Sequence, residues 1–113
     1  MQPVIETEPI TETRGDDWIW PLELLGDNDV PVDLTGCAYD GAALKWRDGT
    51  LDLTIANGRL SVDAANGGVT VSITRADTGV VPDGQRARVV VPIVDTQGRK
   101  STLLIIPILV IAP

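Results

Sequence analysis

Hydrophobic and polar residues alternate along several short stretches of this chain. The clearest stretch runs from Trp18 to Leu24 and has an apolar residue at every second position. A repeat of two residues is typical of a β-strand with one buried face. The same alternation recurs in the segments 50–56 and 69–74. The pattern therefore predicts a protein made mainly of β-strands.

Turn-forming residues separate these stretches. The dipeptides Asp48-Gly49 and Asn57-Gly58 are strong turn signals, because Asn, Asp and Gly tolerate positive φ. The segment 26–31 reads GDNDVP and reverses the chain after the tryptophan strand, and the segment 96–99 joins a terminal hairpin. Strands then recur at the roughly 8–12-residue spacing typical of sandwiches. We expect an all-β fold, an antiparallel β-sandwich with about seven or eight strands.

One short helical turn is expected within this all-β chain. Thr74 and Asp77 have the spacing of a capping box, with Asp in the acidic place. We therefore place a single helical turn there.

The first residues of the chain differ from the rest. Residues 1–13 alternate acids with Thr, Val and Ile, and Pro3 and Pro9 interrupt them. Proline has no backbone N–H and is confined to edge strands within sheets. We interpret 1–13 as an extended N-terminal arm and 14–113 as a single β-sandwich domain, which fits the length of 113 residues.

The composition indicates how the core is built. The chain has no Phe, one Met and three Trp, so aliphatic side chains and indoles must fill the core. Trp18 and Trp20 share a face beside Leu22 and are expected inside it. The alternative is an exposed aromatic platform, including Trp46, that stacks on carbohydrate. Cys37 is the single cysteine and is expected to be a small buried apolar residue.

Charge and hydropathy narrow the possible partners. The net charge is −7, and the nine basic residues are dispersed along the sequence, so nucleic acid is not an expected partner. The acidic N-terminus lacks the features of a secretory signal, so we expect synthesis in a cytoplasm. The apolar run from Leu103 to Ala112 is about ten residues, whereas a membrane helix needs roughly 20. No membrane partner is expected.

No catalytic constellation is visible in the sequence. The absence of histidine excludes His-based nucleophile systems and His metal ligation. Asp16 with Asp17, and Asp27 with Asp29, could in principle act as a carboxylate pair, but we expect them to be solvated turn residues. Asp27 and Asp29 with Asp33 could supply oxygen ligands to Ca²⁺, yet the loop lacks EF-hand spacing. We predict no enzyme activity, no cofactor and no metal site.

The arm and the last strand are the expected assembly surfaces. An exposed strand edge can pair with a strand from another subunit. The residues assigned to this interface are Val4, Ile5, Ile10, Leu103, Leu104, Ile105, Ile106, Ile108 and Val110.

Three segments of the chain resemble a known group of proteins. The first is RGDDWIWPLELLGDNDVPVDLTG at 14–36, the second covers the paired-strand region 55–73, and the third runs from 74 to 99 and ends in Asp-Xaa-Xaa-Gly-Arg. Together they resemble small phage and prophage virion proteins, and the organisation is similar to the N-terminal domain of phage baseplate upper proteins. The segment RARVVVPIVD at 86–95 departs from the family's usual Tyr-rich strand, and LLIIPILVI at 103–111 is more apolar than its final strand.

The resemblance implies both a fold and a role. It implies an Ig-like β-sandwich that is a non-enzymatic, multicopy building block of a bacteriophage tail, baseplate or neck, located in the virion. Its implied partners are other virion proteins and copies of itself, as a homo-oligomer in a symmetric assembly. The departures leave open a capsid decoration or head-fibre protein. A carbohydrate-binding or adhesin module that uses exposed tryptophans is the alternative from another class.

Overall fold

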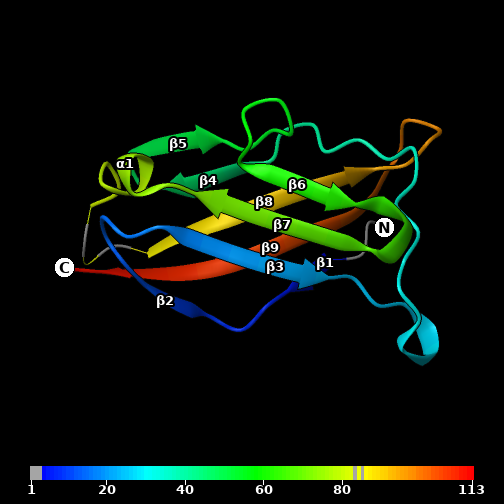
Figure 1. Cartoon of the computed structure of the whole chain (residues 1–113), viewed down its shortest axis with the longest axis horizontal. Helices are drawn as coiled ribbons and strands as arrows, with labels where there is room; N and C mark the ends of the chain where they lie inside the picture. Colours follow the sequence, from blue (N-terminus) through cyan, green and yellow to red (C-terminus); the bar gives the residue numbers. More distant parts are fainter. Residues whose placement is uncertain (1–3, 83, 85) are drawn as a thin grey trace.

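The computed structural model describes residues 4–82, 84 and 86–113, which form two β-sheets packed face to face (Figure 1). Nine strands are described: β1 (Val4–Glu6), β2 (Ile10–Thr13), β3 (Trp18–Glu23), β4 (Ala43–Trp46), β5 (Gly49–Asp52), β6 (Leu60–Asp63), β7 (Gly68–Ile73), β8 (Arg86–Val94) and β9 (Lys100–Ile111). Three short helices join them: η1 (Asp27–Asp29), η2 (Ala64–Asn66) and α1 (Arg75–Thr78).

The sheet order identifies the architecture. The smaller sheet has the order β3-β7-β6, and the larger has the order β1-β9-β8-β4-β5, with β2 also paired to β9. Immunoglobulin domains arrange strands B-E-D in one sheet and G-F-C, extended by C′, in the other. The observed order matches this arrangement from β3 to β9, but the immunoglobulin strand A beside B has no counterpart in the smaller sheet, and β1 and β2 lie in the larger sheet. The prediction of an all-β sandwich is confirmed, as is the terminal hairpin formed by β8 and β9.

The N-terminal residues form part of the larger sheet. β1 and β2 both run parallel to β9, with Val4 opposite Leu103 and Ile10 opposite Ile108. The sandwich is therefore not purely antiparallel, and these two strands raise the count above the number expected. Pro9 lies in the break between β1 and β2, because proline cannot donate a ladder hydrogen bond.

The two neighbouring tryptophans lie in the core, as the alternation predicted. Trp18 is fully buried and Trp20 is 6% exposed. Each indole N–H donates to β2, from Trp18 Nε1 to the Thr13 carbonyl at 2.8 Å and from Trp20 Nε1 to Glu12 Oε1 at 3.2 Å. Burying an indole with its N–H satisfied combines apolar burial with a directional contact. The tryptophan strand of one sheet therefore anchors the N-terminal strand of the other.

The predicted helical turn is present as α1. It packs through Thr78, whose hydroxyl is fully buried and donates to the Asp16 carbonyl at 2.7 Å. The Thr78 hydroxyl also accepts from the Gly15 N–H at 3.1 Å, and the Arg14 guanidinium donates to the Gly79 carbonyl at 2.8 Å. These contacts hold the β2–β3 turn against the end of α1.

Candidate functional site

The last strand presents its two faces to different surroundings. Leu104, Ile106, Ile108 and Val110 are at most 2% exposed and belong to the core between the sheets. These four residues, expected at an assembly interface, instead fill the chain's own core, because β9 is an interior strand of the larger sheet. Strand alternation places every second residue on the opposite face.

The remaining residues assigned to the interface lie around the same strand. Leu103 and Ile105 are half-buried on the outer face of β9. Ile10 is half-buried and packs against the core. The side chains of Val4 and Ile5 lie outside the described part of the structure. The edge of β9 is covered within the chain by β1 and β2, and pairing of these strands with a neighbouring subunit stays a prediction.

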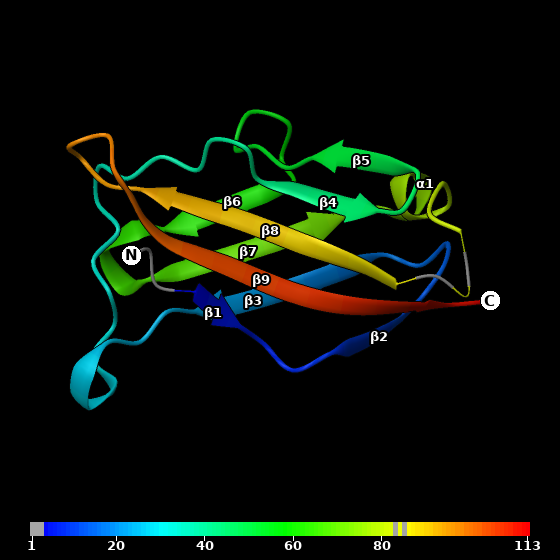
Figure 2. The same ribbon diagram turned by 180° about the vertical axis from the view of Figure 1, so that it is seen from behind.

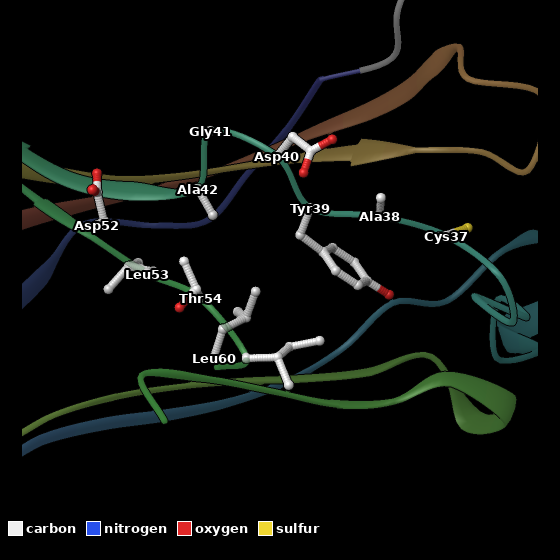
Figure 3. Close-up of a pocket in the computed structure, with 11 residues that line it drawn as sticks. Cys37, Ala38, Tyr39, Asp40, Gly41, Ala42, Asp52, Leu53, Thr54 and Leu60 are labelled. Atoms are coloured by element: carbon white, nitrogen blue, oxygen red, sulfur yellow. The ribbon is translucent and has the colours of Figure 1, made fainter. Parts of the chain in front are cut away.

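A hollow of about 480 Å³ opens between the two sheets beside Tyr39. Segments 37–42 and 52–55 line it together with Leu60 (Figure 3). Figure 3 shows the Tyr39 ring pointing from its loop into the space between the layers. The Tyr39 hydroxyl is buried and has no hydrogen-bond partner among the described residues. A buried polar atom of this kind is normally satisfied by water or a ligand.

Tyr39 and Cys37 are two ionisable residues of this hollow whose pKa values are raised. Burial raises the pKa of the Tyr39 phenol. Burial, followed by the carboxylates of Asp95 and Asp33, raises the pKa of the Cys37 thiol. A protonated thiol is a poor nucleophile, so these groups offer hydrogen bonding rather than covalent chemistry. Cys37 is half-buried, more exposed than the sequence predicted.

The carboxylates near the predicted turns stabilise backbone. Asp17 accepts the Arg75 N–H at 2.7 Å at the start of α1. Asp33 accepts from the N–H and hydroxyl of Thr35, and these hydrogen bonds hold the pKa of Asp33 below its ordinary value. Hydrogen bonds from the Arg99 and Gln97 N–H groups, with the charge of Arg99, do the same for the pKa of Asp95. Among the described residues, no group of three or more acidic or cysteine side chains could hold a metal ion.

Trp46 is the third tryptophan, and it packs differently from the other two. It is half-buried against the core, and its indole lies over the β4–β5 turn. A Cβ added at Gly49 would overlap this ring, so the turn requires glycine at that position. Since Trp18 and Trp20 are buried, they cannot form an exposed platform with Trp46.

Pairing of β4 with β8 gathers four cations that are dispersed in the sequence. Lys45 lies opposite Arg88 in the ladder, and Arg47 and Arg86 line the same outer-face hollow of about 430 Å³. We call this site, formed by Lys45, Arg47, Arg86 and Arg88, the basic hollow. All four residues are exposed, and none takes part in an ion pair within the described part of the chain.

Sequence reasoning missed the basic hollow because it judged the cations by their distribution along the chain. A signal was nevertheless present. Lys45 and Arg47 stand two residues apart, as do Arg86 and Arg88. In a strand, residues two apart lie on the same face. Each pair therefore indicated one basic strand face. The pairing of β4 with β8, which brings the two pairs together, could not be predicted from the sequence.

No helix in the described ranges is sufficiently long and apolar to cross a membrane. No protein-family model matches the chain, and a comparison with curated proteins finds no significant match. The function is therefore inferred from the fold and its surfaces.

Proposed function

We propose that this protein is a non-enzymatic structural module of a bacteriophage virion, present in several copies in a tail, baseplate or neck. The observation that carries the proposal is the way the N-terminal strands complete the larger sheet. β1 and β2 are three and four residues long and pair with residues 103–105 and 108–111 of β9, respectively. Short strands at the edge of a sheet are elements that subunits can exchange or supply to one another.

Several features of the molecule support an assembly role. The sheets bury a continuous aliphatic and indole core, which makes a rigid unit. The backbone N–H of Thr7 donates to the Ile105 carbonyl at 3.0 Å, and that of Arg14 donates to the Ile111 carbonyl at 2.9 Å. The same β9 groups would accept an identical arm from a second copy. The resemblance of segments 14–36, 55–73 and 74–99 to phage virion proteins agrees with this role.

The carbohydrate-binding alternative has less support. It requires exposed indoles that lie side by side, and Trp18 and Trp20 pack against each other inside the sandwich with ring centroids 6.0 Å apart. The hollow beside Tyr39 is lined by one aromatic ring, aliphatic residues and the carboxylates of Asp40 and Asp52, so it lacks the pair of rings that a stacking platform needs. An assembly module accounts for more of the described features.

The test measures the mass of the full-length protein by sedimentation velocity over a wide concentration range. We expect association into oligomers of defined size as the concentration rises. Thr7→Pro removes an arm-to-β9 hydrogen bond and should weaken the association, whereas Glu8→Pro, between β1 and β2, is the matched control. A single-chain mass over the whole range, together with absence of the chain from purified phage particles by mass spectrometry, would contradict the proposal.

A further inference from the structure

The basic hollow combines charges that disfavour one another. Lys45 and Arg88 are directly opposite in the β4–β8 ladder, and like charges in that position are destabilising. Four of the chain's nine basic residues meet there, although the net charge is −7. No described carboxylate forms an ion pair with any of them. The cluster is thus suited to an acidic partner from outside the chain.

The segment between β3 and β4 has the complementary character. Residues 24–32 form a projecting hairpin, closed by hydrogen bonds from the Gly26 N–H to the Val30 carbonyl at 2.8 Å and from the Val32 N–H to the Leu24 carbonyl at 2.9 Å. Leu25 and Val30 are 47% and 58% exposed on its sides. We call residues 24–32 the acidic hairpin.

Carboxylates surround this hairpin. Asp29 is exposed at its tip, and Asn28 and Asp29 both have φ of 58°, a conformation that Asn and Asp tolerate better than most residues. Glu23 and Asp33 are exposed on its two sides. Carboxylates at this position can complement the charge of a basic partner, and the exposed aliphatic side chains beside them can be buried in the contact.

The hairpin has a fixed base. Gly67 has a φ of 66°; its carbonyl accepts the Leu24 N–H at 2.8 Å, and its N–H donates to the Ala64 carbonyl of η2 at 3.4 Å. A Cβ at Gly67 would stand 2.7 Å from the Leu24 carbonyl oxygen and 2.8 Å from that of Val32. The close backbone approach at Gly67 therefore holds the hairpin at a defined position on the smaller sheet.

The two surfaces lie at opposite ends of the molecule. In Figure 1 the cyan loop that contains η1 projects at one end of the long axis, and the tip of β4 and the start of β8 lie at the other; Figure 2 shows the same separation from behind. The long axis measures 40 Å. Surfaces this far apart cannot meet within one copy, but they can meet between successive copies.

We propose that the basic hollow of one copy receives the acidic hairpin of a second copy. The contact is head-to-tail, so repeated copies form a ring if the rotation closes and a filament if it does not. Leu25 and Val30 would cover the Trp46 side of the hollow, and the carboxylates of Glu23 and Asp29 would neutralise Lys45 and Arg88. This inference deepens the proposed function and rests on it, because it supplies a contact between copies of an assembly module.

Charge reversal tests the contact. One variant, Lys45→Glu with Arg88→Glu, reverses the hollow and keeps a like-charged ladder pair. The other, Glu23→Lys with Asp29→Asn, removes the acids and keeps a residue that tolerates positive φ at the tip. The control, Arg75→Glu with Lys100→Glu, makes the same charge change as the hollow variant at exposed positions outside the hollow.

Self-association is measured by sedimentation velocity for each protein and for the two reversed variants mixed. In low salt we expect the wild type to associate, each reversed variant to associate about tenfold more weakly, and the mixture to recover most of the loss. The control should behave as the wild type does. Salt at ~1 M, where the Debye length is about 3 Å, should weaken the wild-type contact.

Several outcomes would overturn the contact. Association weakened equally by the control variant, or unchanged in both reversed variants, would do so. Failure of the mixture to recover association would also do so. The same holds if the basic hollow binds a single-stranded oligonucleotide in preference to a second copy. If Lys45→Glu with Arg88→Glu does not fold, Lys45→Gln with Arg88→Gln replaces it. Association that survives these variants but is lost in Thr7→Pro would overturn this contact and keep the proposed function.

Discussion

The two sheets share one core, yet their outer faces differ in character. The outer face of the smaller sheet carries short uncharged side chains at Ser61, Thr70 and Ser72, beside the exposed Ile19 and, near one end, the carboxylates of Glu23 and Asp63. The outer face of the larger sheet carries Lys45 opposite Arg88. Short polar side chains keep a sheet face hydrated without repelling one another. Two like charges directly opposite each other in the ladder repel and lower the stability of the fold. Both sheets supply the core, and the larger sheet differs in the like-charged pair on its outer face.

The sheets also differ in how they are held. The smaller sheet is anchored by indoles that reach across the core to β2. The larger sheet is completed by β1 and β2 through backbone pairing with β9. Side chains of both sheets fill the core, but Trp18 of the smaller sheet is fully buried and Trp46 of the larger sheet is half-buried, so changes at these two positions should have unequal effects.

The largest effect is expected for Trp18→Ala in the smaller sheet. The substitution leaves a cavity and removes the hydrogen bond to the Thr13 carbonyl, so we expect a loss of about 3–5 kcal/mol in the free energy of unfolding. Trp46→Ala, at a half-buried position of the larger sheet, should cost clearly less. Urea unfolding of both variants measures the difference. Equal losses in the free energy of unfolding would show that the two tryptophans contribute equally to stability despite their different burial.

A smaller effect is expected for Gly67→Ala at the base of the acidic hairpin. The added Cβ meets two carbonyl oxygens and the backbone has positive φ, so we expect a loss of about 2–3 kcal/mol. Gly58→Ala is the matched control, because Gly58 has a φ of 80° and nothing within 4 Å of the added Cβ. It should cost only about 1 kcal/mol. The same cost for both would mean that φ, rather than the close approach, limits this position.

The smallest effect is expected for Tyr39→Phe, in the seam between the sheets. The hydroxyl is buried without a partner among the described residues, so its removal should change the free energy of unfolding by at most about 1 kcal/mol at neutral pH. A loss of several kcal/mol would show that the hydroxyl makes a hydrogen bond through water.

The same variant has a pH signature. Burial raises the folded-state pKa of Tyr39 above the ordinary tyrosine value of 10.0, so the neutral phenol stabilises the fold below that pH. The stabilisation is lost as the pH rises from the unfolded-state pKa through the folded-state pKa. Urea midpoints of the wild type should therefore fall in alkaline solution, and Tyr39→Phe should fall less. Parallel curves for the two proteins would contradict the assignment to Tyr39.

The core and the turns could be predicted because their signals are local. Alternation from Trp18 to Leu24 placed both indoles inside, and the spacing of Thr74 and Asp77 located α1, although the Thr74 side chain makes no capping hydrogen bond. The basic hollow could not be predicted in the same way, because Lys45 and Arg88 are far apart in the sequence. The hollow beside Tyr39 was missed for a similar reason, since its lining comes from separate segments.

The sequence by itself determined that this chain is an all-β sandwich with an aliphatic and indole core, because the alternation of apolar and polar residues is a local property of short stretches. Only the tertiary structure decided which strands are neighbours. That pairing placed the N-terminal arm parallel to β9, turned Leu104, Ile106, Ile108 and Val110 into the chain's own core, and brought Lys45 opposite Arg88. The physical reason is that backbone hydrogen bonds between strands do not depend on side-chain identity, so register follows from the packing of the whole sandwich.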